Sequence, residues 1–342
     1  MKSKQIIISF IFALILTSCE NEIPFNEKIN PPKIVLNAMI NTNNDENHIF
    51  VSKTGNYDID SVRDVTVYIY VNDVLKEQLT EFLLPKPIVI DGVDGIYTSE
   101  SPEPYLRRKR FTTKLRFNPG DKVKIEVTGE DNKYHAWAED IAPQPAEVEQ
   151  IDTTTIDSYK TRLNITFTDN PNEKNFYRLA MVHKSTTYFK TIDGSERDSS
   201  SFTDIISIDT SEDIVLNEGK VITGEELFPQ IENVYAIFDD TRLNGTYTMK
   251  TSFHNGYFLW RHLDPPPGVV VERAVACLEV HLMSITEMQY YYIKALNILK
   301  SDSYDEYLSA PIAIPSNVEG GVGIVGFSSG TVKTFMYDSY PE

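Results

Sequence analysis

Alternation of apolar and polar residues recurs along the chain, and it predicts short β-strands. Between positions 65 and 71, valine or isoleucine at every second position alternates with threonine and tyrosine. Between 122 and 128, three apolar side chains alternate with lysine, glutamate and threonine in the same way. A period of two residues is typical of a strand with one buried and one solvent-facing side. The same pattern predicts strands at 34–40, 48–53, 114–117 and 135–141.

Turn signals between these strands give the first half of the chain the organisation of a β-sandwich. Asn72-Asp73 follows the strand at 65–71, and Asn118-Pro119-Gly120-Asp121 precedes the one at 122–128; such residues favour turns. We therefore predict, over residues 33–142, a β-sandwich similar to immunoglobulin or fibronectin type III modules. Pro143 and Pro145 would interrupt strand pairing and indicate a linker.

The second half, residues 147–342, is predicted to be a second β-rich domain. Asn244-Gly245 is a strong turn signal. Residues 193–213 are rich in serine and aspartate, and we expect a mobile insertion there. Apolar patterns predict strands at 163–168, from 177 onward, at 269–285, at 312–314 and at 324–337.

One amphipathic helix is predicted near 286–300. Ser284-Ile285-Thr286-Glu287 matches the S-x-x-E capping box that precedes many helices. Helical spacing places Asn297 and Lys300 away from an apolar face. We interpret that face as packing against a sheet, and a tyrosine platform for a ligand is the alternative. The predicted face consists of Tyr291, Tyr292, Ala295, Leu296 and Leu299.

The N-terminal residues have the three regions of a lipoprotein signal peptide. Lys2 and Lys4 are followed by an apolar run at 6–16, which is shorter than the roughly 20 residues that span a membrane as a helix. Leu16-Thr17-Ser18-Cys19 resembles the bacterial lipobox. We therefore expect residues 1–18 to be removed and Cys19 to carry the lipid; the alternative is an ordinary signal peptide with a chance cysteine.

Residues 19–32 follow as a predicted tether that joins the lipid anchor to the domains. Within it, Glu20-Asn21-Glu22 resembles the export signal of surface-displayed lipoproteins, or it is only a polar tether. The side of the outer membrane that the protein faces therefore stays open. Cys277 is the only other cysteine, so lipidation of Cys19 would leave no intramolecular disulfide.

Composition narrows the function classes. The chain has 342 residues, 32 lysines and arginines, and 50 acidic residues, which gives a net charge of −18. Loss of Lys2 and Lys4 with the signal peptide would make it −20 (30 minus 50). This balance argues against sequence-independent nucleic-acid binding, which requires a positive face. The 41% hydrophobic content is sufficient for folded cores.

Three matches to catalytic or cofactor motifs fail on their context. Residues 321–326 spell G-x-G-x-x-G, but too few residues follow for a dinucleotide-binding unit. Residues 326–330 spell G-x-S-x-G, but no histidine follows Ser328. Cys277, Glu279 and His281 would share one strand face, with Cys277 and His281 about 13 Å apart, too far for a catalytic pair. We therefore predict no catalytic residues and no cofactor.

Metal sites and charge clusters give weaker signals. The histidine spacings match no zinc site. Asp239-Asp240, and Asp169 with Asn172, could donate oxygens to Ca²⁺, but solvated turns explain them better. Residues 106–110, Leu-Arg-Arg-Lys-Arg, form a basic cluster that either contacts phosphates or an acidic partner or is simply an exposed loop.

The order of several segments resembles a family of Bacteroidota lipoproteins known as a domain of unknown function, number four-two-four-nine. No single segment is diagnostic, and the resemblance spans essentially the whole mature chain. The family has no established catalytic residues, so it assigns none here. Its members are often encoded beside TonB-dependent outer-membrane receptors, which implies nutrient capture or uptake. The segments are the lipobox at Cys19 and residues 33–40, 134–138, 163–177, 238–245, the helix from about 285, and 316–323.

These observations favour a non-enzymatic, lipid-anchored binding or accessory protein of the outer membrane. A TonB-dependent receptor and an extracellular ligand are the expected partners, and nucleic acid is not. An envelope hydrolase with scattered carboxylates is the first alternative, because carboxylates that pair across strands cannot be recognised in one sequence. A structural or adhesive surface protein is the second alternative.

Overall fold

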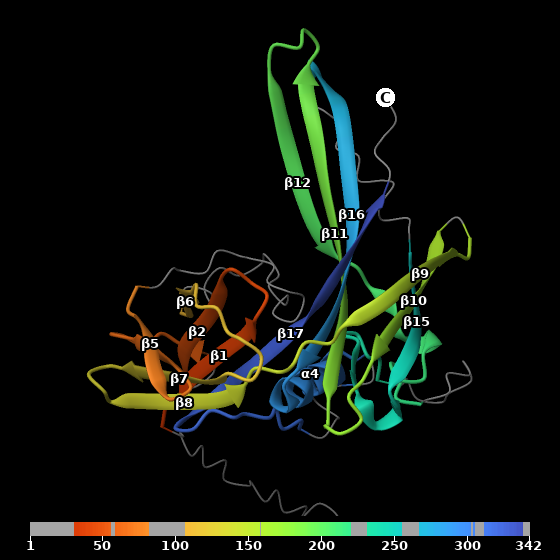
Figure 1. Ribbon diagram of the computed structural model, residues 1–342. Helices are drawn as coiled ribbons and strands as arrows, with labels where there is room; N and C mark the ends of the chain where they lie inside the picture. Colours follow the sequence, from red (N-terminus) through yellow and green to blue (C-terminus); the bar gives the residue numbers. More distant parts are fainter. Residues whose placement is uncertain are drawn as a thin grey trace, which may run out of the picture. The chain divides into compact units, whose positions relative to one another are not determined.

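Strands form nearly all the regular structure of the described residues, as the computed structural model in Figure 1 shows. The described residues are 31–55, 59–81, 107–157, 159–219, 231–254, 267–301, 304 and 311–337. The chain divides into a segment ending at Pro31 and a unit from Pro32 to Glu342, and the description below concerns this second unit. The prediction of a mainly β protein is confirmed.

Nine strands form the sheet that we call the central sheet. Its strand order is β12-β11-β16-β17-β1-β2-β3, with β14 paired to β11 and β6 paired to β2. Its strands are β1 (Ile34–Asn41), β2 (Asn47–Thr54), β3 (Ile59–Asp60), β6 (Lys109–Thr113), β11 (Phe176–Thr191), β12 (Arg197–Ile205), β14 (Ile237–Asp239), β16 (Val269–Ile285) and β17 (Gly321–Tyr337).

Two four-stranded sheets accompany the central sheet. The first outer sheet has the order β5-β4-β7-β8, and the second has the order β13-β15-β10-β9. The first consists of β4 (Thr66–Val71), β5 (Val74–Leu79), β7 (Lys122–Gly129) and β8 (Tyr134–Ile141). The second consists of β9 (Val148–Thr155), β10 (Lys160–Thr168), β13 (Ile208–Asp209) and β15 (Thr246–His254). Among the described residues, the helical elements are the 3₁₀ turns η1 (Thr210–Glu212) and η2 (Asp240–Arg242) and the helix α4 (Glu287–Lys300).

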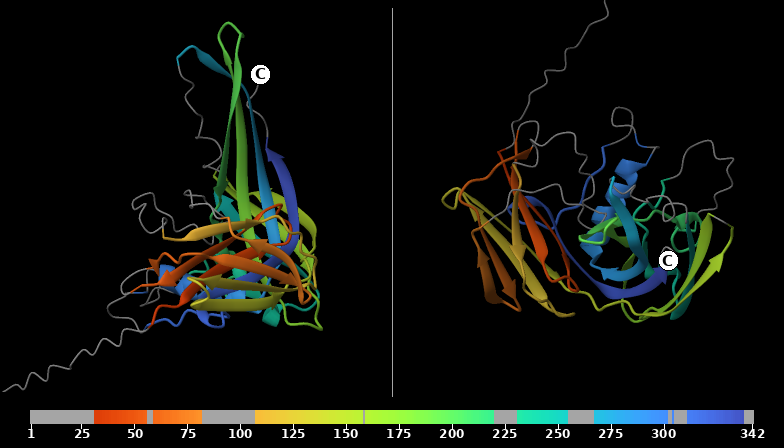
Figure 2. Two further views of the ribbon diagram at one scale, coloured as in Figure 1. Left: turned by 90° about the vertical axis from the view of Figure 1, so that its left-hand side faces the viewer. Right: turned by 90° about the horizontal axis from the view of Figure 1, so that it is seen from above.

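Strand β17 lies in the middle of the central sheet and joins its two halves. It pairs in parallel with β1, from Ile34 opposite Gly321 to Asn41 opposite Ser328. Its later residues pair antiparallel with β16, up to Ala276 opposite Tyr337. The central sheet therefore contains strands from before and after positions 142–147, where the prolines predict a linker between two domains. Figure 2 shows β17 running between the two groups of strands.

Alternate residues of the central strands face opposite sides of the central sheet, and each side packs against different elements. Even positions of β1 pack with the first outer sheet, and even positions of β16 from Leu278 to Leu282 pack with the second. The register places both sets on the same side as the odd residues of β17, including Val325 and Phe335. The two outer sheets thus cover one face of the central sheet, and the layers formed by the first outer sheet and the β1–β2 part of the central sheet are consistent with the predicted sandwich.

Helix α4 covers the opposite face. Met283 and Ile285, which alternate with the residues facing the second outer sheet, pack with Tyr290 and Ile293 of the helix. The helix begins after Thr286, whose side chain makes no capping hydrogen bond. The predicted capping box is wrong because Ser284 still belongs to β16, where it pairs with Tyr177 and Ser329.

The predicted apolar face of the helix is also wrong by about one residue. Tyr291 is 44% exposed, whereas Tyr290 is 2% exposed and Asn297 is buried. Three consecutive tyrosines at 290–292 point in three different directions around the helix. Periodicity alone therefore does not determine which of them is buried. Tyr292 and Leu296 pack only at the margin of this core.

Residues 193–213 do not form the predicted mobile insertion. Arg197–Ile205 is strand β12, which pairs with β11 from Lys190 to Val182. Strands β11, β12 and β16 run side by side in Figure 1, and Figure 2 shows the same three strands from a second side. Within the part of the chain that the structure describes, no helix has the length and apolar character needed to cross a bilayer.

The glycines of β17 serve close approach between strands. A Cβ atom at Gly330 would lie well inside contact distance of the Leu282 carbonyl oxygen and of the Met283 Cα. Gly323 has a φ of +119°, and a Cβ there would meet the Leu36 carbonyl. The G-x-G-x-x-G and G-x-S-x-G sequences therefore lie within one strand of the sheet, as their context predicts.

Gly330→Ala is expected to lower the free energy of unfolding by about 3 kcal/mol, because the added methyl group meets backbone atoms that no side-chain rotation can clear. Gly245→Ala is the matched control. Its Cβ would meet nothing within 4 Å, and only its φ of +73° is unfavourable, so about 1 kcal/mol is expected. Urea unfolding measures both values, and equal losses would contradict the explanation.

Candidate functional site

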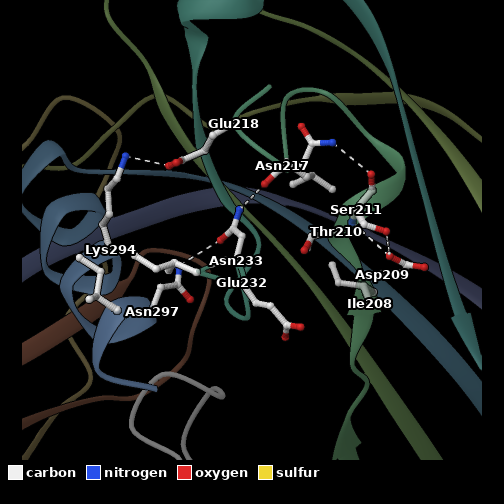
Figure 3. A pocket seen from close by; sticks show the side chains of 13 residues that line it. Ile208, Asp209, Thr210, Ser211, Asn217, Glu218, Glu232, Asn233, Lys294 and Asn297 are labelled. Carbon is white, nitrogen blue, oxygen red and sulfur yellow. Dashed lines mark hydrogen bonds and ion pairs between the residues drawn. The ribbon is translucent and has the colours of Figure 1, made fainter. Parts of the chain in front are cut away.

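A polar cavity lies between α4, η1 and the segments on either side of residues 220–230, and Figure 3 shows it from close by. Its volume is about 430 Å³, within the range of pockets that bind small molecules. Polar side chains and four apolar ones line it: Ile208, Asp209, Thr210, Ser211, Leu216, Asn217, Glu218, Ile231, Glu232, Asn233, Lys294, Asn297 and Ile298.

Two asparagines hold one wall of the polar cavity. Asn233 Nδ2 donates to the carbonyls of Leu216 at 2.8 Å and Ile237 at 2.6 Å. Its Oδ1 accepts from the Ile237 N–H and from Asn297 Nδ2 at 3.0 Å. Asn297, buried on α4, accepts the N–H of Tyr235. The amide pair therefore fastens two loop segments to the helix.

The wall formed by η1 depends on carboxylates. Asp209 Oδ1 accepts from the Ser211 N–H and hydroxyl and so caps the turn. Lys160 pairs with Asp209 Oδ2 at 3.1 Å and with Glu212 at 2.8 Å, and Arg162 adds a contact to Glu212. Burial alone would raise the pKa of Glu212, but hydrogen bonds from Lys160, Ser252 and Arg162 outweigh it and hold that pKa below its usual value.

An ion pair separates the polar cavity from a smaller one of about 210 Å³. Lys294 Nζ lies 2.7 Å from Glu218 Oε1 and 3.4 Å from the Tyr290 hydroxyl, and Glu218 and Lys294 line both cavities. Burial would lower the pKa of Lys294, but the hydrogen bond to Glu218 and the nearby Tyr290 raise it, so the ammonium stays charged. Arg242 lies against Gly219 on the side of the smaller cavity.

This arrangement is suited to holding a ligand in place. The asparagines and Asp209 are already committed to backbone partners, so the wall is fixed before any ligand arrives. The ammonium of Lys294 is neutralised by Glu218 and contacts a tyrosine, which is not the arrangement of an activated nucleophile with its base. Glu232 lines the cavity with an exposed side chain.

The comparison with family models matches residues 20–334 to "Domain of unknown function (DUF4249)". The chain belongs to the DUF4249 family. The family assignment inferred from the order of its segments is therefore confirmed. Curated protein sequences give no match.

Solved structures show only distant similarity to this DUF4249 chain. It is similar to a DUF4785 family protein from Legionella pneumophila (9% identity, TM-score 0.24, 75% of this chain and 54% of that one). The FN1–FN3 domains of chicken CNTN1 give 10% identity and a TM-score of 0.24 over 74% and 61% of the two chains. A Corynebacterium diphtheriae protein described as membrane anchored gives 8% identity and a TM-score of 0.20 over 87% of this chain and 59% of that one. At these TM-scores the similarity carries no argument.

The residues singled out from the sequence do not gather in the polar cavity. Cys19, the predicted lipid attachment site, lies outside the described residues. Glu279 Oε2 accepts a hydrogen bond from His281 Nε2 at 3.1 Å, and its other oxygen pairs with Lys184. Both Glu279 and His281 lie on the face of β16 opposite Leu278. Ser328 is buried in β17, and its hydroxyl donates to the Ile40 carbonyl.

The acidic residues considered as calcium ligands have structural partners. Asp169 accepts the Tyr177 hydroxyl at 2.6 Å, and Asp240 accepts the Asn175 N–H at 2.5 Å. Asp239 caps η2 through the Thr241 N–H. Among the described residues, no group of three or more histidines, cysteines or acidic residues is arranged to hold a metal ion.

The cavity residues carry almost no sequence signal. Asn233 and Asn297 are 64 positions apart, and neither belongs to a motif. The one available hint is Asn297, a polar residue within the apolar helix pattern, but the predicted face places it toward solvent. Only the pairing of the strands brings the two amides together.

Asn233→Ala is expected to lower the free energy of unfolding by about 3 kcal/mol, because it leaves buried backbone groups at Ile237 and Leu216 without partners. Glu232→Ala, in the same cavity but exposed, should change it by less than about 0.5 kcal/mol. Chemical denaturation of the two variants checks this, and a similar loss in both would disprove the amide explanation.

Unfolding free energy should also depend on pH through Glu212. Because its folded pKa is lowered, its contribution is complete above its unfolded pKa of about 4.5 and is lost as pH falls through the folded value. Glu212→Gln should therefore show a smaller loss of stability between about pH 5 and about pH 3 than the wild type. Glu232→Gln is the control and should keep the wild-type slope; identical slopes for all three proteins would refute the assignment.

Proposed function

We propose that this chain is a lipid-anchored binding or accessory protein of the cell envelope. In this proposal Cys19 carries the lipid that holds the folded unit at the outer membrane, and a TonB-dependent receptor is its partner in nutrient uptake. The proposal describes a non-enzymatic protein. Its organism group, by resemblance, would be the Bacteroidota.

The observation that carries the binding role is the preformed polar cavity. A volume of about 430 Å³ fits a small ligand or the end of a larger one. The hydrogen bonds of Asn233 and Asn297 fix the wall in advance, which reduces the ordering cost of binding. The mixture of isoleucine, hydroxyl and amide groups suits a polar ligand with some apolar surface.

The anchoring role is supported by the sequence at residues 1–19. A charged start, a short apolar run and small residues before Cys19 are together the pattern of an exported lipoprotein. Two acyl chains on one cysteine provide stable membrane attachment without a spanning helix. The net negative charge of the chain would not draw it to anionic lipid, so the lipid has to supply the attachment.

Cys19→Ala should move the full-length protein from the membrane fraction to the soluble fraction, or leave it unprocessed with its signal peptide. Cys277→Ala is the matched control, because it removes the other cysteine of the chain. This variant should stay in the membrane fraction. Fractionation, with mass measurement of the N-terminal peptide, distinguishes these results. A Cys19→Ala protein that is cleaved and still membrane-bound would end the anchor proposal.

The receptor partnership needs its own experiment. Chemical cross-linking in native membranes, followed by affinity purification and mass spectrometry, should recover a TonB-dependent receptor with the wild-type protein. The same procedure with Cys19→Ala should lose the receptor if anchoring brings the two together. Wild-type samples in which no transporter is enriched over the control would rule out this partnership.

A further inference from the structure

Within the described part of the chain, Arg110 is a buried cation with two guanidinium nitrogens that have no hydrogen-bond partner. It is 6% exposed, and its Nε and Nη1 atoms make no hydrogen bond. Two more exposed arginines form ion pairs, Arg162 with Glu212 and Arg197 with Glu272. A guanidinium removed from water without a counter-charge costs several kcal/mol. Burial of these two nitrogens is therefore unfavourable unless a hydrogen-bond acceptor joins them.

The side chain of Arg110 lies on the face of the central sheet that does not look into the first core. In β6, Arg110 pairs opposite Phe50 and Thr112 pairs opposite His48. Their neighbours Ile49 and Phe111 belong to that core, so alternation directs the other set to the opposite face. Residues two apart on one strand lie about 7 Å apart, which brings Thr112 and His48 next to Arg110.

Among the described residues, His48 and Glu46 interact electrostatically with Arg110. The charge of Arg110 lowers the pKa of Glu46 less than Lys114 does, and Lys114 Nζ pairs with the Glu46 carboxylate at 2.9 Å. Burial, followed by the charge of Arg110, lowers the pKa of His48, so its ring is neutral at pH 7. His48 Nδ1 lies 3.1 Å from the Thr112 hydroxyl. A neutral imidazole and a hydroxyl thus lie beside a guanidinium with two unsatisfied nitrogens.

We propose that Arg110, with His48 and Thr112, binds an oxyanion, either a phosphate or a carboxylate group. The guanidinium offers charge-assisted hydrogen bonds that match the oxygens of both groups. The hydroxyl and the neutral imidazole are hydrogen-bonded to each other, so together they leave one further neutral donor beside it. Arg110 belongs to the basic cluster at 107–110 that the sequence singles out, and the site is separate from the polar cavity and independent of the proposed function.

The oxyanion could arrive free or as part of a lipid headgroup, and the experiment separates these sources. Wild-type protein, purified in detergent, is titrated with inorganic phosphate and with acetate at constant ionic strength, by calorimetry and thermal unfolding. For the lipid source, the lipidated protein is mixed with phosphatidylcholine vesicles with or without phosphatidylglycerol, so the anchor contributes equally to both. The excess binding caused by phosphatidylglycerol is the quantity compared.

Arg110→Met should weaken binding of the effective anion at least about tenfold and abolish the anion-dependent rise in melting temperature. Arg110→Lys should recover part of the affinity, because it keeps the charge without the planar guanidinium. Arg116→Met is the matched control. It removes an exposed arginine that pairs with Asp45, and it should bind as the wild type does.

The unfolding temperature in anion-free buffer is a second measurement. If Arg110 had only a structural role, its replacement would lower this temperature. Without anion, Arg110→Met should unfold at the same temperature as the wild type or higher, because a buried charge with two unsatisfied nitrogens is gone. The proposal is overturned if wild-type protein responds to none of phosphate, acetate or phosphatidylglycerol. It is equally overturned if Arg110→Met keeps the wild-type response, or if it is strongly destabilised in anion-free buffer.

Discussion

The parallel pairing of β1 with β17 is the interaction on which the rest of the structure depends. It joins residues 34–41 to residues 321–328, so it closes almost the whole described chain into one unit. The same strand β17 continues along β16, and this places both outer sheets on one face of the central sheet. The opposite face is then left for α4, and the polar cavity forms where that helix meets η1 and its neighbouring loops.

Individual strands can be predicted from the sequence, but the pairing of strands that are far apart in the sequence cannot. Alternation in 65–71 and 122–128 predicts β4 and β7, and both strands are present because period two reports which face is buried. The partner of β1 could not be predicted, because parallel pairing leaves no turn signal between the strands. The helix was predicted with nearly the right bounds, but its buried face depends on the position of β11 and β16. Asn233 and Asn297 become a site only through that placement.

Two polar environments in this chain contrast in how their hydrogen bonds are satisfied. Around the polar cavity, the amides, the carboxylates of η1 and Lys294 have partners within the protein, so the wall is rigid without a ligand. At Arg110 the reverse holds, and burial of two nitrogens without hydrogen-bond partners makes the local structure sensitive to an added anion. A buried group that is satisfied specifies shape, whereas one that is unsatisfied stores free energy that binding can release.

The late position of β17 in the sequence has a consequence for how the protein folds. Until residues 321–337 are available, β1 and β16 each present an unpaired edge, and the cores beneath them lack Val325, Phe327 and Phe335. Contacts of such large sequence separation make folding slow, because the closure entropy of the intervening chain must be overcome first. A chain of this kind remains incompletely folded while it is being made, because the sheet closes only after its last strand is available.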